Sequence, residues 1–250
     1  MKKHIPNIIT SLNLLSGCIA ILFVVSGDLV VASFLVLLGM FLDFFDGLAA
    51  RLLHVQSDVG LQLDSLADMV SFGVVPGLMM FQLLNKATTP HLLETGFETS
   101  ESMNWFGDSI SFLPFLGLLI ILSSAYRLAK FNVDTRQTSS FIGLPTPAIT
   151  LLIISLPLMY QFQYYEVMEG VIFNKWFLIV LTLLSSYLLN AEIHLFALKF
   201  KTWDFASNRV RYIFLGISLL LLLVFKFIAI PVILILYILF SVFQKDKISS

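Results

Sequence analysis

The stretch Phe41–Gly73 reads FLDFFDGLAARLLHVQSDVGLQLDSLADMVSFG and places four aspartates, Asp43, Asp46, Asp64 and Asp68, in an apolar setting. One carboxylate at mid-membrane costs roughly 2.5 to 3.5 kcal/mol on insertion scales, so four without a function would be a large penalty. Neighbouring carboxylates repel one another, and divalent cations between them are the usual way to keep such a cluster ionised. The stretch therefore predicts a site that binds divalent metal ions.

The composition around this stretch is that of an integral membrane protein. The chain has 250 residues, of which 58% are hydrophobic and 12% charged, and its mean hydropathy is +0.92. Soluble domains are far less apolar. The net charge of −1 and the lack of a continuous basic stripe argue against a nucleic-acid partner. We see no soluble domain, linker or repeat, so we expect residues 1–250 to form one all-α membrane domain.

Apolar runs of about 17 to 25 residues predict a single bundle of about eight transmembrane helices. Pro231 and the short gap around Lys226 make the last pair the least certain, because they fit either a tight hairpin or one kinked segment. The predicted spans lie near 5–26, 29–52, 60–84, 109–131, 143–163, 172–190, 211–227 and 229–243.

The distribution of lysine and arginine predicts the orientation in the membrane. With eight spans, the side that holds both termini carries twelve of these cations and the other side three. Such an excess marks the cytoplasmic side. We therefore expect both termini, and the aspartate cluster with them, on the cytoplasmic face of the cell membrane. The twelve are Lys2, Lys3, Arg51, Arg127, Lys130, Arg136, Lys199, Lys201, Arg209, Arg211, Lys245 and Lys247, and the three are Lys86, Lys175 and Lys226.

The spacing of the aspartates places them on two facing helix surfaces. Asp43 and Asp46 are three residues apart and share one face of the second predicted span. Asp64 and Asp68 are four residues apart and share a face of the third. Two antiparallel neighbours can point these carboxylates into a common cleft, and glycine and alanine on the same faces leave room for a ligand.

Ligation by oxygen atoms alone suits Mg²⁺ or Mn²⁺ and disfavours zinc. Two divalent ions would balance the four negative charges, as in two-metal sites that catalyse in-line phosphoryl transfer. Arg51, one residue beyond Ala50, could bind a phosphate with its forked guanidinium. No serine, cysteine or histidine next to a base suggests a covalent intermediate, so direct displacement is favoured.

These residues resemble a known family. The string Asp43-x2-Asp46-Gly47-x2-Ala50-Arg51-x8-Gly60-x3-Asp64-x3-Asp68 matches the signature of the CDP-alcohol phosphatidyltransferases at every fixed position. The resemblance implies a membrane enzyme in which an alcohol attacks the β-phosphorus of a CDP-linked lipid and releases CMP.

The resemblance also implies roles for individual residues. The four aspartates would ligate two divalent ions, and Asp68 would act as general base toward the alcohol, as a hydroxyl nucleophile requires. The residues implied to contact the cytidine diphosphate are Gly47, Ala50, Arg51, Ser57 and Gly60.

Three further stretches resemble the membrane-bound phosphatidylserine synthases of this family: IPNIITSLNLLSG at the start, DSLADMVSFGVVPG at 64–77 and RLAKFNVDTRQTSSFIGLPTPA at 127–148. They imply CDP-diacylglycerol as donor and L-serine as acceptor, and the family suggests a homodimer. A zwitterionic acceptor needs a cation for its carboxylate, and Arg127 and Lys130 are the candidates, with Asn132 and Arg136 nearby. Arg127 and Lys130 could equally be interfacial anchors.

Asn7 and Asn13, on a polar stripe of the first span, could contact the CDP-lipid or form hydrogen bonds between helices. Two alternatives to the main functional prediction stay open. Glycerol-3-phosphate could be the acceptor, which would make a phosphatidylglycerophosphate synthase. In a different class, intramembrane aspartates could form the pathway of a cation-coupled transporter.

Overall fold

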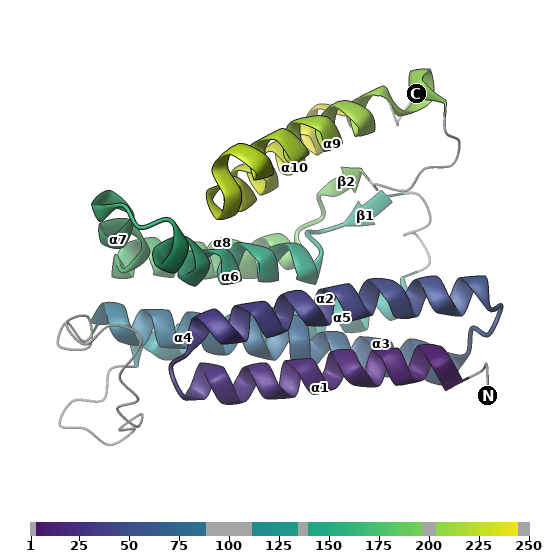
Figure 1. The fold of residues 1–250 in the computed structure, drawn as a ribbon, viewed down its shortest axis with the longest axis horizontal. Coiled ribbons are helices and arrows are strands. Elements are labelled where there is room, and N and C mark those ends of the chain that lie inside the picture. The colour runs from purple at the N-terminus through teal and green to yellow at the C-terminus, as the bar shows by residue number, and fades with distance from the viewer. Residues whose placement is uncertain (1–3, 89–111, 135–139, 197–203, 245–250) are drawn as a thin grey trace.

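The computed structural model describes residues 4–88, 112–134, 140–196 and 204–244 (Figure 1). The predicted all-α class is confirmed, since helices make up nearly all of the described chain. In chain order the elements are α1 (Ile5–Val25), α2 (Leu29–Leu52), α3 (Asp58–Asp68), η2 (Met69–Val74), α4 (Val75–Thr88), η4 (Leu113–Leu118), α5 (Leu119–Val133), β1 (Ser140–Ile142), α6 (Thr146–Phe162), α7 (Glu166–Ile172), α8 (Lys175–Asn190), β2 (His194–Phe196), α9 (Phe205–Phe225), η5 (Lys226–Ile228) and α10 (Ala229–Gln244).

Local sequence signals set the ends of the first three helices. Gly27 takes a positive φ of 89° in the turn after α1, a conformation that glycine adopts without a steric penalty. Asp28 then caps α2, because its carboxylate accepts a hydrogen bond from the Val31 backbone N–H at 3.0 Å. Ser57 caps α3 in the same way, accepting from the Gly60 N–H at 3.1 Å. After these turns α2 runs antiparallel to α1 and α3 antiparallel to α2, and both α2 and α3 contact α1 (Figure 1).

The third predicted span, 60–84, is one continuous helical segment from Asp58 to Thr88. It consists of α3, the π-helix η2 and α4. The two ends differ in their surroundings. In α3 only Ala67 is buried, whereas in α4 every residue from Val75 to Leu84 except Leu78 is buried. The segment thus runs from a polar surface at α3 into the core of the bundle at α4.

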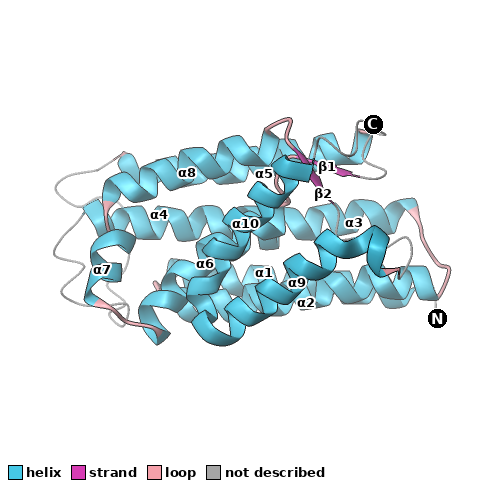
Figure 2. Ribbon diagram, turned by 90° about the horizontal axis from the view of Figure 1, so that it is seen from above, coloured by secondary structure: helices cyan, strands magenta, loops and turns pink. Residues whose placement is uncertain are grey.

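The helices form layers (Figures 1 and 2). Helices α1 to α5 make the lower layer of Figure 1, α6, α7 and α8 lie above it, and α9 with α10 lies on top. The last two pack against each other as the arms of a hairpin, and α10 also contacts α6. The buried core is centred on α4 and α6, with Met79, Leu83 and Ile153 fully shielded.

The number of membrane spans differs from the prediction of eight. Five helical segments of the described chain are long and apolar enough to cross a membrane, or six if the pair α7 and α8, bent by 59°, is one span. Helix α6 is apolar but only 17 residues long. The hairpin α9 and α10 satisfies the test as one stretch, Asn208–Ser241. Apolar runs alone do not determine such bends and breaks. For the last pair they fitted either a hairpin or one kinked segment, and the structure shows the hairpin (Figure 1).

Two further differences concern loops. The span predicted to begin at 109 begins at Leu113 in the described residues, and its first three predicted residues, 109–111, lie outside them. Strands β1 and β2 were not expected from the sequence, because three residues are too few to show a strand period. They pair antiparallel, with Phe141 opposite Leu195. This small sheet joins the loop before α6 to the loop after α8.

Candidate active site

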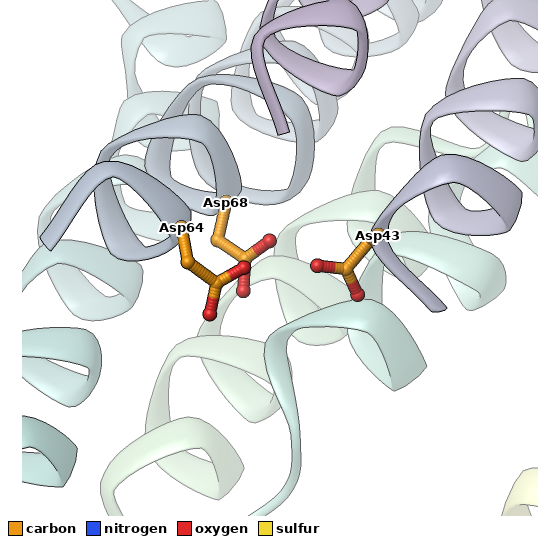
Figure 3. Close-up of side chains that lie close together, drawn as sticks. All are labelled: Asp43, Asp64 and Asp68. Atoms are coloured by element: carbon orange, nitrogen blue, oxygen red, sulfur yellow. The ribbon is translucent and has the colours of Figure 1, made fainter. Parts of the chain in front are cut away.

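Three of the four predicted aspartates converge between α2 and α3. One carboxylate oxygen from each of Asp43, Asp64 and Asp68 lies within 4.8 Å of the other two. Figure 3 shows Asp64 and Asp68 projecting from one helix toward Asp43 on the other. The i, i+4 spacing in α3 explains why its two carboxylates point the same way. The predicted shared cleft of α2 and α3 is thus present for these three residues.

Asp46 lies beside this cluster rather than inside it. It is buried, with 4% of its surface exposed, and it lines a cavity of about 460 Å³. Asp64 lines the same cavity while also belonging to the cluster. The carboxylate cluster and the cavity are therefore adjoining parts of one site.

The cavity is lined by six of the seven residues predicted to bind the CDP-lipid. Helix α1 supplies one, α2 three, and the start of α3 with its cap two. The six are Asn7, Gly47, Ala50, Arg51, Ser57 and Gly60. The five residues that the resemblance implied as cytidine diphosphate contacts thus surround one space, together with Asn7, which is 53 positions before Gly60.

Small residues and local hydrogen bonds give the cavity its shape. A Cβ atom on Gly60 would lie 3.1 Å from both Asn7 Oδ1 and Ser57 Oγ, so a larger residue would crowd both side chains. Arg51 is exposed, and its Nε donates to the Gly47 carbonyl at 2.9 Å. Arg51 also lines the cavity, so its guanidinium is available to a phosphate bound there.

Asn13, the seventh predicted CDP-lipid contact, is placed differently. It is fully buried and does not line the cavity. Its Oδ1 lies 2.9 Å from where a Cβ on Gly39 would be, and its backbone carbonyl accepts a hydrogen bond from Ser71 Oγ at 3.2 Å. The side-chain oxygen and nitrogen of Asn13 have no hydrogen-bond partner among the described residues, so neither the predicted contact with the CDP-lipid nor a side-chain hydrogen bond between helices is seen.

Among the predicted acceptor-binding residues, Arg127 is the one buried next to the cluster. Only 8% of it is exposed, its Nε has no hydrogen-bond partner, and its guanidinium interacts electrostatically with Asp68 and Tyr237. The guanidinium also lies 6.0 Å from the centre of the Phe131 ring. A buried guanidinium with an unused donor is suited to bind an anionic group.

The other acceptor candidates have partners in the protein. Lys130 Nζ lies 4.0 Å from the Glu192 carboxylate, in a partly exposed pair. Asn132 Nδ2 donates to Ser65 Oγ at 2.9 Å, which ties the end of α5 to α3 beside Asp64. Arg136 lies outside the described residues.

The carboxylate oxygens of the cluster are suitable ligands for divalent metal ions. Three carboxylate oxygens from two helices can reach one ion, and Asp68 Oδ1 and Asp46 Oδ2 are buried without a hydrogen-bond partner. Hard cations such as Mg²⁺ and Mn²⁺ bind such oxygen ligands. No histidine or cysteine belongs to the cluster, as the sequence led us to expect.

Sequence reasoning missed several residues of the site. Thr10, Gln56 and Asp58 line the cavity although no role was predicted for them. Thr10 follows Asn7 by three residues on the same helix, and this i, i+3 spacing is the signal in the sequence that could have placed it here. Nothing in the sequence indicated Ser65, because its role depends on where Asn132 lies.

Comparisons with known proteins agree with this geometry. A sequence model of the family described as "CDP-alcohol phosphatidyltransferase" matches residues 3–188. Three similar proteins are each named CDP-diacylglycerol–serine O-phosphatidyltransferase. The one from Bacillus subtilis is 33% identical over 163 residues, which cover 64% of this chain and 78% of that protein. The one from Helicobacter pylori (strain J99) is 32% identical over 151 residues, which cover 60% of this chain and 55% of that protein. The one from Saccharomyces cerevisiae is 34% identical over 188 residues, which cover 69% of this chain and 57% of that protein.

Proposed function

Because the chain belongs to the CDP-alcohol phosphatidyltransferase family, we propose that it transfers the phosphatidyl group of CDP-diacylglycerol to the hydroxyl of L-serine. The products are phosphatidylserine and CMP. The observation that carries this proposal is the sharing of Asp64 between the carboxylate cluster and the cavity. A nucleotide-linked lipid bound in this cavity would have its reacting phosphates next to the proposed metal ligands. The names of the similar proteins support serine as the acceptor.

The cavity is the proposed binding site for the cytidine diphosphate group of CDP-diacylglycerol. Arg51 and the small residues Gly47 and Gly60 surround a space large enough for a cytidine diphosphate group. The family is metal-dependent. When bound by Asp43, Asp64 and Asp68, with Asp46 beside them, two divalent ions would neutralise phosphate oxygens and the departing CMP.

The displacement itself needs one proton transfer. Asp68 accepts the proton of the serine hydroxyl while the serine oxygen forms its bond to the β-phosphorus. The bond from that phosphorus to the oxygen bridging to CMP breaks, and CMP leaves with the electron pair. Asp68 suits this role because it is the cluster member that interacts electrostatically with Arg127. The proposed base, Asp68, and the proposed acceptor-binding residue, Arg127, are therefore neighbours.

Arg127 is the group we propose to bind the serine carboxylate. It is the buried candidate with an unused donor, whereas Lys130 and Asn132 already have partners. A forked guanidinium can hold a carboxylate through two hydrogen bonds and so fix the direction of the serine hydroxyl. Glycerol-3-phosphate, the alternative acceptor, carries a dianion that would need more cations than this one.

We further propose that the site opens to the cytoplasm. Arg51 in the last turn of α2 and Lys130 in the last turn of α5 lie at the end of the bundle that holds the cluster, while Lys86 and Lys175 lie at the other end. A cysteine in place of His54 tests this orientation. It should react with an impermeant maleimide in inside-out vesicles and be protected in right-side-out ones.

The acceptor is tested with purified protein, CDP-diacylglycerol and Mn²⁺ or Mg²⁺, with one alcohol added at a time. We expect CMP release only with L-serine, and loss of release when a chelator removes the metal. Release with glycerol-3-phosphate alone would support the phosphatidylglycerophosphate alternative. No release with any alcohol would contradict the proposed reaction.

A further inference from the structure

The helix that carries Asp64 and Asp68 changes its winding immediately after Asp68. Residues Met69–Val74 form the π-helix η2, and the Val75 N–H donates to the Val70 carbonyl five residues earlier. Such a turn holds one residue more than an α-helical turn. π-helical turns inside α-helices are rare and are frequent at functional sites.

The extra residue determines which way the aspartates face. One residue corresponds to about 100° of rotation in an α-helix, so the segment before η2 is turned by roughly that angle relative to the segment after it. In the structure, Asp64 and Asp68 face Asp43 while Met79 and Leu83 are fully buried in the core. Because α4 is buried on nearly all sides, the winding of η2 sets the rotation of α3, and of its two aspartates, relative to α4.

Two hydrogen bonds to neighbouring helices hold η2 in this form, one from a side chain of α6 and one from a side chain of η2 itself. Thr150 Oγ1 on α6 donates to the Phe72 carbonyl at 3.0 Å and also to the Thr146 carbonyl of its own helix at 2.9 Å. Ser71 Oγ donates to the Asn13 carbonyl of α1 at 3.2 Å. A widened turn leaves carbonyl groups poorly paired within the helix, and outside donors compensate for them. Thr150 has no exposed surface, so water cannot replace its hydroxyl.

Glycines allow the neighbouring helices to approach η2 this closely. A Cβ on Gly17 of α1 would overlap Ser71 Oγ. A Cβ on Gly73 would lie 3.2 Å from the Ser124 Cβ of α5. The π-helix is therefore enclosed by α1, α5 and α6, and a change in its winding would require these helices to move.

We propose that Thr150 is a positioning residue for the reaction: its hydrogen bond to the Phe72 carbonyl keeps η2 π-helical and thereby holds Asp68 in its orientation toward Asp43 and the acceptor. Thr150 itself touches neither the cluster nor the cavity. The inference rests on the proposed function in one respect, namely that Asp68 is the base.

The test compares two threonines that differ in this bond alone. Thr150 and Thr182 are both fully buried, and each hydroxyl donates to the carbonyl four residues earlier in its own helix. Of these two threonines, only Thr150 has a described hydrogen bond to another helix, the bond to the Phe72 carbonyl of η2. Thr150→Val should lower kcat about 10- to 100-fold, since small misplacements of a reacting group have effects of this size. In Thr150→Val the KM for CDP-diacylglycerol should stay unchanged. Thr182→Val should keep the wild-type kcat. Thr150→Ser, which retains the hydroxyl, should also have a kcat close to the wild-type value.

A second measurement does not depend on activity. Hydrogen–deuterium exchange of the metal-free protein should be faster for the peptide covering η2 in Thr150→Val, and unchanged in Thr182→Val and Thr150→Ser. Ser71→Ala should show a weaker effect in the same direction. Wild-type exchange and wild-type kcat in Thr150→Val would overturn the inference. If exchange increases while kcat does not fall, Thr150 holds η2 but does not position the base. Full activity of Asp68→Asn would instead contradict the proposed function and leave the exchange result standing.

Discussion

The segments Asp58–Thr88 and Asn208–Ser241 are both candidate membrane spans, yet they have opposite surroundings. In the most apolar part of the first, 67% of the residues are buried inside the protein, whereas in the second only 6% are. The second segment, from α9 and α10, is nevertheless the more apolar in composition. Lipid tails are as apolar as a protein core, so composition alone does not separate residues facing lipid from residues facing protein.

The difference shows where the function can be built. The segment with the aspartates is enclosed by α1, α5 and α6, so its carboxylates can be held in a defined orientation. The hairpin of α9 and α10 lies on the outside of the molecule, above α6 in Figure 1. It lies beyond residues 3–188, which match the family. Its described link to the site is Tyr237, which interacts with Arg127.

The largest effect is expected from Asp68→Asn in the enclosed segment. Loss of a general base reduces turnover about 10²- to 10⁴-fold, so CMP release should fall by this amount while the protein stays folded and inserted. Asp28→Asn is the matched control, because asparagine caps a helix as well as aspartate does. Near-normal turnover of Asp68→Asn would show that the base is another group.

Leucine-to-alanine changes compare the two segments directly. Leu83 in α4 is fully buried, and 74% of Leu223 in α9 is exposed. Leu83→Ala should destabilise the protein by about 2 to 5 kcal/mol, because it leaves a cavity in a packed core. Leu223→Ala should have little effect, since lipid or detergent fills the space. Thermal unfolding in detergent measures both, and equal losses would mean that α9 is packed against protein that the structure does not show.

The acceptor site gives a smaller, more selective effect. Arg127→Met should raise KM for serine about 10- to 100-fold, as expected when one partner of a buried charged pair is removed. KM for CDP-diacylglycerol should change little. Arg209→Gln, at an exposed arginine of α9, is the control and should leave both constants unchanged. A rise in the CDP-diacylglycerol KM alone would assign Arg127 to the donor phosphates instead.

The smallest effect is expected from Lys130→Gln. Lys130 pairs with Glu192 at 4.0 Å on a partly exposed surface, and such pairs contribute about 0 to 1 kcal/mol. Stability and the serine KM should therefore stay close to the wild-type values, with the KM changed less than about 3-fold. A loss as large as that of Arg127→Met would mean that Lys130 leaves Glu192 and binds the acceptor.

Much of the site could be predicted from the sequence because its spacing is local. Asp64 and Asp68 share a face through the helical repeat, and the caps at Asp28 and Ser57 are set by neighbouring residues. The residues that the resemblance implied as cytidine diphosphate contacts line one cavity, because the short turn between α2 and α3 brings the two helix ends together. The orientation of the termini in the membrane remains a prediction, since the structure contains no membrane and several of the cations counted for it lie outside the described residues.

Other features depend on contacts between distant segments. The i, i+3 spacing of Asp43 and Asp46 predicted a shared face, yet Asp46 lies beside the cluster and lines the cavity. For Asn13 the sequence left open a CDP-lipid contact or hydrogen bonds between helices; the structure buries it beside Gly39 and Ser71, with no hydrogen-bond partner for its side chain among the described residues. The eight predicted spans became five or six because bends and short helices are decided by packing.

By itself, the sequence determined a helical membrane protein with carboxylates from two neighbouring helices at one site, because hydropathy and helical spacing act over short stretches of chain. Only the tertiary structure decided that Arg127 is buried beside Asp68 while Lys130 pairs with Glu192. It also decided that the helix after Asp68 is wound as a π-helix, held by Thr150 from 78 residues away along the chain. The physical reason is that burial and hydrogen bonding between helices exist only once the helices are packed together.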